Sequence, residues 1–151
     1  MKLWERLAAA VALLALLVAL DPTPGYGQPV SVAGAAAATL IQQGEYLAHA
    51  ADCVACHSAP GGAAYAGGRG MGSPLGTIYT TNITPDPDTG IGKWSADDIA
   101  ALLKSGQTPE FDFVGGGMAQ VVSGTAKLTD EDRHAMAVFL KSVPPLRATG
   151  K

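Results

Sequence analysis

Two cysteines and a histidine stand close together in the run Cys53-Val54-Ala55-Cys56-His57. Two thiols at this spacing on a helical turn can each form a thioether to one vinyl group of a haem. The next residue then lies under the ring, where its imidazole can bind the iron. The pattern thus supplies covalent attachment and a proximal ligand together. Because these are the only two cysteines of the 151-residue chain, haem attachment would leave no free thiol.

The same side chains could instead form a disulfide, a thiol redox site or a zinc site. A disulfide between Cys53 and Cys56 would close a very small loop and stabilise little. A thioredoxin-like site would follow a strand in a βαβ unit, and no strand alternation precedes Cys53. A zinc site would need further ligands, and only His49 and His134 remain besides His57. Haem attachment is therefore the favoured interpretation, with these three as alternatives.

The N-terminus has the organisation of a secretory signal. A short charged opening over residues 1–6 precedes fourteen consecutive apolar residues at 7–20. This run suits a signal peptide and is short for a membrane span, which needs about 20 residues. We predict a signal peptide over residues 1–27, with cleavage as late as residue 35, and an Ala-, Gly- and Pro-rich linker over 28–38. The expected location is the periplasm, with a retained N-terminal anchor as the alternative.

Charge and composition exclude one class of partner and favour a cofactor. The formal net charge is −3, and it stays at −3 without residues 1–27, which hold two basic and two acidic side chains. A nucleic-acid-binding domain would need a basic stripe, so no nucleic-acid partner is expected. Aromatic residues make up 6% of the chain, which is low for a globular core. A buried haem would supply the missing apolar volume.

Three helices are predicted to position these residues. The first covers about 39–56, where apolar residues recur at helical spacing. The second begins after the N-cap Ser95 and stops at Gly106, a residue type common just past a helix end. The third begins after the N-cap Thr129, has an acidic first turn, and ends before the prolines at 144–145.

A long segment rich in glycine and proline, residues 58–94, separates the first two helices. Such a loop is unusual in a compact domain unless it wraps around a cofactor. Residues 77–81 could form a short strand, but one isolated strand does not make a sheet. We find no internal repeat. The predicted fold is therefore all-α, with three main helices and long loops wrapped around one covalent haem, in a single domain over 39–147.

The iron of an electron carrier needs a second axial ligand, and methionine is usual opposite histidine. We expect Met118, which follows three glycines in an irregular segment between the second and third helices. Met71 and an open sixth position are the alternatives, whereas Met136 is expected in the core of the third helix. In metal-bound histidines, the N–H of the other ring nitrogen nearly always donates a hydrogen bond to a neighbouring group. For His57 we expect a backbone carbonyl around residues 60–62.

Further motifs carry a family resemblance. They are Gly44-Glu45-Tyr46-Leu47, Tyr65-Ala66-Gly67-Gly68 and the run Gly-Thr-Ile-Tyr-Thr-Thr-Asn-Ile-Thr-Pro-Asp at residues 76–86. With them, the chain resembles the class I cytochrome c domain. More narrowly, it is similar to the cytochrome subunits of periplasmic alcohol, aldehyde and gluconate dehydrogenases, from about residue 43 to 145.

The resemblance implies that Gly44 lies where the first and last helices cross. It implies Cys53 and Cys56 as thioether sites, His57 as proximal ligand and Met118 as distal ligand. One segment departs from the family pattern. Those subunits usually carry Tyr-Pro-Ala-Met-Pro-Tyr around the distal methionine, whereas residues 113–122 of this chain read Phe-Val-Gly-Gly-Gly-Met-Ala-Gln-Val-Val. They also often hold three such domains, whereas this chain holds one.

On this resemblance, the expected function is electron transfer through one covalent haem c rather than catalysis. The expected partners are redox proteins: a donor dehydrogenase and an acceptor oxidase or other cytochrome. Membrane association would need an uncleaved leader or a partner subunit. The rival interpretation is a haem catalyst or gas sensor with an open distal site.

Overall fold

The computed structural model describes residues 32–74 and 76–148. The predicted signal peptide and the start of the linker lie outside this part of the chain. Within these ranges, the elements in chain order are five helices and one hairpin: α2 (Val32–Ala50), α3 (Cys53–Cys56), β1 (Gly70–Ser73), β2 (Gly76–Tyr79), α4 (Ala96–Ser105), α5 (Gly116–Thr125) and α6 (Asp130–Ser142). The prediction of a mostly helical domain is confirmed.

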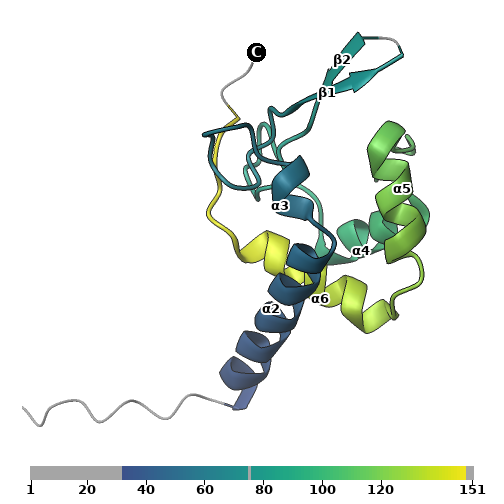
Figure 1. Ribbon diagram of the computed structural model, residues 1–151. Helices are drawn as coiled ribbons and strands as arrows, with labels where there is room; N and C mark the ends of the chain where they lie inside the picture. Colours follow the sequence, from purple (N-terminus) through teal and green to yellow (C-terminus); the bar gives the residue numbers. More distant parts are fainter. Residues whose placement is uncertain (1–31, 75, 149–151) are drawn as a thin grey trace, which may run out of the picture. The chain divides into compact units, whose positions relative to one another are not determined.

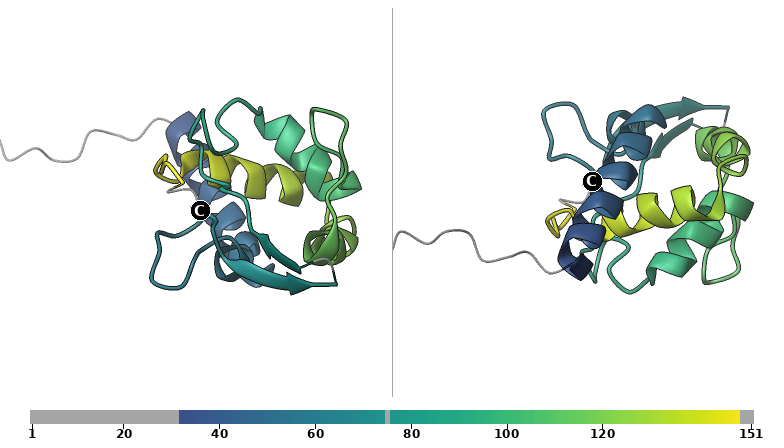
Figure 2. Two further views of the ribbon diagram at one scale, coloured as in Figure 1. Left: turned by 90° about the horizontal axis from the view of Figure 1, so that it is seen from above. Right: turned by 90° about the horizontal axis from the view of Figure 1, so that it is seen from below.

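Helix α6 lies in the middle of the domain. Helix α2 crosses α6, and α4 packs along it (Figures 1 and 2). The β1–β2 hairpin and α5 lie on the same side of α6 (Figure 1). The core forms where these helices meet, and Met136 is wholly buried in it, as predicted. The other buried apolar side chains include Ile99, Leu102 and Leu103 of α4 and Phe139 and Leu140 of α6.

Gly44 marks the crossing of α2 and α6. A Cβ atom at this position would lie 2.0 Å from the carbonyl oxygen of Ala135 and 2.8 Å from Cβ of Phe139. The two helix backbones therefore touch at a point that only glycine allows. This close approach offsets the cost of about 1 kcal/mol that glycine carries inside a helix. The crossing implied by the family resemblance is confirmed.

The caps of α4 and α6 form as predicted. The Ser95 hydroxyl accepts a hydrogen bond from the Asp98 amide at 3.1 Å, and the Asp98 carboxylate accepts one from the Ser95 amide at 2.8 Å. Gly106 ends α4 with φ 78°. The Thr129 hydroxyl accepts from the Asp132 amide at 3.1 Å. These local bonds fix where both helices begin, so the sequence alone could locate them.

Two predictions about the first half of the chain need correction. The first helix is not continuous over 39–56: α2 begins at Val32 and ends at Ala50, and Asp52 adopts a left-handed conformation at φ 57° before α3 starts. The strand near residues 77–81 is not isolated, because β2 pairs antiparallel with β1. The β1 sequence Gly-Met-Gly-Ser has no hydrophobic alternation, which is why the pattern missed it.

The segment before the third predicted helix is not irregular. Residues Gly116–Thr125 form α5, so Met118 lies in the first turn of a helix rather than in a loop. Gly115, Gly116 and Gly117 at its start oppose helix formation by propensity, and no capping side chain stands there. Tertiary packing of its later residues holds the helix. Among the helices in the described ranges, none has the length and hydropathy of a membrane span.

Candidate functional site

The two cysteines lie on α3, a single helical turn that follows the left-handed Asp52. The amide of His57 donates to the carbonyl of Cys53 at 2.9 Å, so the histidine continues directly from this turn. Neither cysteine is in a disulfide, and both are partly buried. Burial raises the pKa of the Cys53 thiol to about 11. The turn presents two thiols and an imidazole from one short stretch of backbone.

His57 has a fixed tautomer. Its Nδ1 lies 2.8 Å from the carbonyl oxygen of Thr81. A carbonyl can only accept, so Nδ1 carries the hydrogen and the lone pair of Nε2 remains for a metal. Burial lowers the pKa of His57, and the hydrogen bond to Thr81 partly offsets this effect. The ring is therefore neutral and oriented, as a metal-binding histidine must be.

The partner of His57 is a backbone carbonyl, as expected, but the predicted position was wrong. It comes from Thr81, 24 residues along the chain, rather than from residues 60–62. The loop after α3 turns back so that the Gly67 amide donates to the His57 carbonyl at 2.8 Å, and the Gly68 amide donates to the Thr80 carbonyl at 2.8 Å. Thr81 belongs to the run that carries the family resemblance, which was its only signal in the sequence.

Gly67 allows this approach. It has φ +74°, and a Cβ atom there would lie 2.5 Å from the carbonyl carbon of Thr81. The side-chain amide of Asn82, the next residue after Thr81, donates to the Leu146 carbonyl at 2.7 Å. This bond holds the backbone on the other side of Thr81. The position of the Thr81 carbonyl is thus set by Gly67 and Asn82 together.

Gly67→Ala should therefore raise the reduction potential of a haem bound to His57. The new methyl group would push the Thr81 carbonyl away and weaken its hydrogen bond, so the imidazole would become a less basic ligand and favour ferric iron less. If losing the bond costs the ferric form about 1 kcal/mol more than the ferrous form, the shift is on the order of 40 mV for one electron. A spectroelectrochemical titration measures it.

Gly61→Ala is the matched control. Gly61 also has a positive φ, of 69°, but a Cβ atom there would meet nothing within 4 Å. The control carries the same backbone strain without the contact to Thr81. An equal shift in both variants, or none in Gly67→Ala, would show that the Thr81 carbonyl does not tune His57.

The methionine candidates separate into two groups. Met118 is partly buried and packs against the core from the first turn of α5. Met71 on β1 lies beside the same turn, since a Cβ atom on Gly117 would be 3.6 Å from its terminal methyl carbon. Met136 lies in the core with no exposed surface. The structure thus places Met71 beside Gly117, in the same helical turn as Met118, and assigns Met136 to packing.

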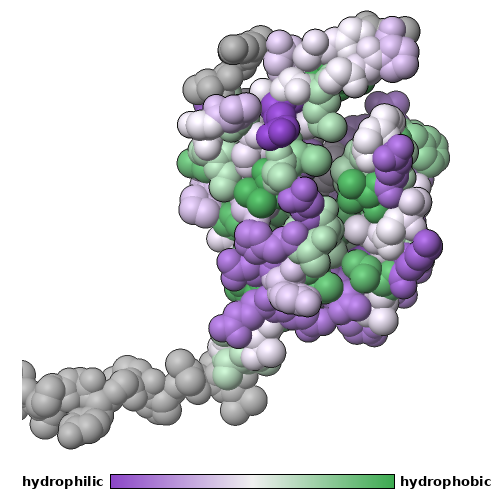
Figure 3. Space-filling view, in the orientation of Figure 1, coloured by the Kyte–Doolittle hydropathy of each residue, from purple (hydrophilic) through white to green (hydrophobic). Residues whose placement is uncertain are grey.

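A hollow separates α3 from α5. Figure 1 shows these helices on opposite sides, and the space-filling view is hollowed between them (Figure 3). A separate cavity of about 330 Å³ lies between the end of α2 and α5, and its lining is mainly apolar or small: Leu47, Ala50, Ala51, Gln120, Val121, Gly124, Thr125 and Leu128. On the hairpin, Met71 and Ile78 are paired across the two strands, and their exposed fractions are 36% and 54%.

These features fit a haem. The turn α3, which carries Cys53 and Cys56 and runs on into His57, lies on one side of the hollow, and α5, which carries Met118, lies on the other (Figure 1). Exposed apolar side chains such as Ile78 are the kind of surface that a flat, largely apolar ring would cover. Cys53, Cys56, His57 and Met118 are the residues that could hold it.

The other histidines have different surroundings. His49 is exposed near the end of α2. His134 on α6 lies 3.4 Å from a carboxylate oxygen of Asp97 on α4. Within residues 32–74 and 76–148, no three His, Cys, Asp or Glu side chains come close enough to hold a metal ion between them. The zinc alternative therefore has no support from the described residues.

Comparison with known proteins shows the family of this chain. The family model described as cytochrome c matches residues 41–144. The chain belongs to the cytochrome c family. Membership implies a covalently bound haem c, and it confirms the predicted fold class and the resemblance drawn from the motifs.

Several relatives of this cytochrome c are subunits of larger enzymes. It is 45% identical over 113 residues to the gluconate 2-dehydrogenase cytochrome c subunit of Pantoea cypripedii, covering 74% of this chain and 25% of that subunit. It is 40% identical over 152 residues to the alcohol dehydrogenase (quinone) cytochrome c subunit of Gluconobacter oxydans (strain 621H), covering 100% and 29%. A protein of Cereibacter sphaeroides called "Diheme cytochrome c-type" is 41% identical over 113 residues, covering 70% and 36%. The chain thus spans about a quarter to a third of the length of these relatives.

Proposed function

We propose that this cytochrome c holds one haem, attached through Cys53 and Cys56, with His57 and Met118 as axial ligands. We propose further that it transfers electrons in the periplasm from a dehydrogenase to a respiratory acceptor. The observation that carries the proposal is the hydrogen bond of 2.8 Å from His57 Nδ1 to the Thr81 carbonyl, which leaves Nε2 as a ligand. A haem, when bound, supplies the reversible one-electron change of its iron.

The chain's own residues then have defined tasks. Cys53 and Cys56 hold the ring in place, so that it is not lost between electron transfers. Thr81 keeps the His57 ring oriented and raises its basicity through the Nδ1 hydrogen bond. A methionine thioether opposite the histidine favours ferrous iron and raises the potential. The apolar border of the hollow excludes water from the ligands.

The proposed partners follow from the relatives. Two of them are cytochrome c subunits of enzymes named as gluconate and alcohol dehydrogenases. A dehydrogenase is therefore the proposed electron donor, and an oxidase or another cytochrome is the proposed acceptor. The secretory pattern of residues 1–20 supports a periplasmic location. One cysteine pair in the sequence supports one haem per chain.

An open or labile distal site is the second candidate, and one observation favours it. Nothing lies within 4 Å of the Cβ positions of Gly115 and Gly116, which precede Met118. Because the backbone just before Met118 is loosely packed, the methionine could leave the iron more easily than one in a rigid loop.

A redox titration combined with carbon monoxide exposure tests the proposal against this rival. An electron carrier with both axial positions filled should titrate as one reversible electron per chain, and its ferrous form should bind carbon monoxide slowly. Rapid and complete binding of carbon monoxide by the native protein would favour the open-site candidate instead.

A further inference from the structure

Helix α5 is held mainly at its C-terminal end. The Thr125 hydroxyl donates to the Leu103 carbonyl of α4 at 2.6 Å, and both Val122 and Thr125 are buried. At the other end, the N-cap Gly115 offers no side-chain hydrogen bond. Met118, Val122 and Thr125 follow one another at spacings of four and three residues, so they share one face of the helix. The methionine is thus carried by a helix whose firm attachment lies two turns away.

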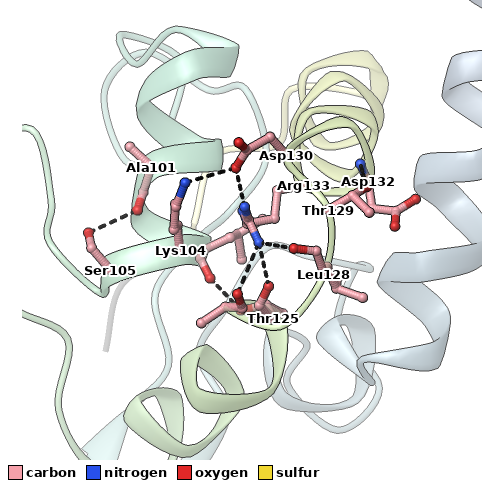
Figure 4. A network of polar contacts seen from close by, with 11 residues as sticks. Ala101, Lys104, Ser105, Thr125, Leu128, Thr129, Asp130, Asp132 and Arg133 are labelled. Atoms are coloured by element: carbon pink, nitrogen blue, oxygen red, sulfur yellow. Dashed lines mark hydrogen bonds and ion pairs between the residues drawn. The ribbon is translucent and has the colours of Figure 1, made fainter.

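A buried arginine completes this attachment. Arg133 of α6 is only 3% exposed. Its Nη1 donates to the carbonyls of Thr125 at 3.1 Å and Ala126 at 3.3 Å, and also to the Leu128 carbonyl. Its Nη2 donates to the carboxylate of Asp130. Figure 4 shows the guanidinium surrounded by these oxygens at the end of α5.

The chemistry of this contact is specific to arginine. A helix ends with carbonyls that have no partner inside the helix, and the helix dipole places partial negative charge there. The planar guanidinium offers five donors in a fixed fork, whereas an ammonium is a single point charge. Asp130 balances the buried cation and is shared with Lys104 of α4 at 3.0 Å. One side chain therefore joins the end of α5 to α6, whereas the contact of Asp130 with Lys104 is solvent-exposed.

We propose that Arg133 is a positioning residue for the distal ligand: by fixing the end of α5, it keeps Met118 directed at the iron. This inference rests on the proposed ligation by Met118. Residues 118 and 125 are about 10 Å apart along the helix axis at about 1.5 Å per residue. A small rotation of α5 at its attached end therefore moves the methionine sulfur by more than the tolerance of a coordination bond.

Arg133→Lys tests the proposal, with two control variants. The lysine keeps the charge but has one nitrogen where arginine uses two, so it cannot bind the carbonyls and the Asp130 carboxylate in the same geometry. The sulfur-to-ferric-iron band in the near infrared should therefore weaken markedly. Carbon monoxide binding to the ferrous protein and amide hydrogen exchange in α5 should each become about tenfold faster. The first control, Lys104→Met, breaks the exposed contact to the same Asp130 and should change none of these three readouts. The second, Ser95→Ala, removes the α4 N-cap and lowers overall stability without touching α5.

Thr125→Val provides a second variant, because it removes the hydroxyl bond to Leu103 and keeps the volume. It should weaken the same band in the same direction. Equal band loss in Ser95→Ala and Arg133→Lys would overturn the proposal, because the effect would then follow overall stability. Faster exchange in α5 with an unchanged band would also overturn it. If Met118→Ala itself leaves the band intact, the ligand assignment fails, and that result is separate from the exchange measurement on α5.

Discussion

Met118→Ala should abolish the near-infrared sulfur-to-ferric-iron band, lower the midpoint potential and let the ferrous form bind carbon monoxide readily. The thioether favours ferrous iron, so its loss stabilises the ferric state. Axial ligands set haem potentials over a range of about 0.8 V, and we expect a fall on the order of 100 mV or more. Absorption spectra and a potentiometric titration of the purified variant measure both effects.

Met71→Leu and Met136→Leu are the controls for this substitution. Met71→Leu is the more informative control, because the methyl group of Met71 lies beside Gly117, next to the proposed ligand in sequence. Leucine keeps most of the volume in both cases and removes no proposed ligand. Both variants should retain the band and the potential. If Met71→Leu alters them and Met118→Ala does not, then Met71 is the ligand.

Replacing both cysteines, as Cys53→Ala with Cys56→Ala, should remove covalent haem and most of the stability. Without an attached ring, the apolar side chains that it would cover, such as the exposed Ile78 on the hairpin, stay in contact with water. Each Å² of apolar surface left exposed costs about 25 cal/mol, so a few hundred Å² amount to several kcal/mol. That is comparable with the total stability of a domain, about 5–15 kcal/mol. Thermal unfolding followed by circular dichroism measures the loss.

The single variants Cys53→Ala and Cys56→Ala are the internal controls. Each keeps one thiol that can add to a vinyl group, so each should retain haem and an intermediate stability. A double variant that unfolds at the temperature of the native protein would contradict the account, because the haem would then contribute nothing to the fold.

The sequence predicted those parts of the fold that local interactions determine. Ser95 and Thr129 cap their helices through bonds to residues three positions along, so the starts of α4 and α6 could be located. Helix α5 could not, because glycines begin it and its stabilising partners, Arg133 and Leu103, come from other helices. The hairpin was missed because one of its strands is half glycine.

The same division holds for the candidate site. The spacing of Cys53, Cys56 and His57 within one turn allowed their shared role in haem attachment to be predicted from the sequence alone. Thr81 lies 24 residues away and acts through its backbone carbonyl, which any residue type has. Arg133 resembles an ordinary charge on a helix surface until the structure shows it buried against the end of α5.

Intact-mass analysis of the protein matured in an export-competent host tests the central claim most directly. The account predicts the mass of the mature chain plus one haem, retained under denaturing conditions because two thioether bonds hold it. The mass of the bare chain, with both thiols free to react with an alkylating reagent, would contradict the haem site and the proposed function that rests on it.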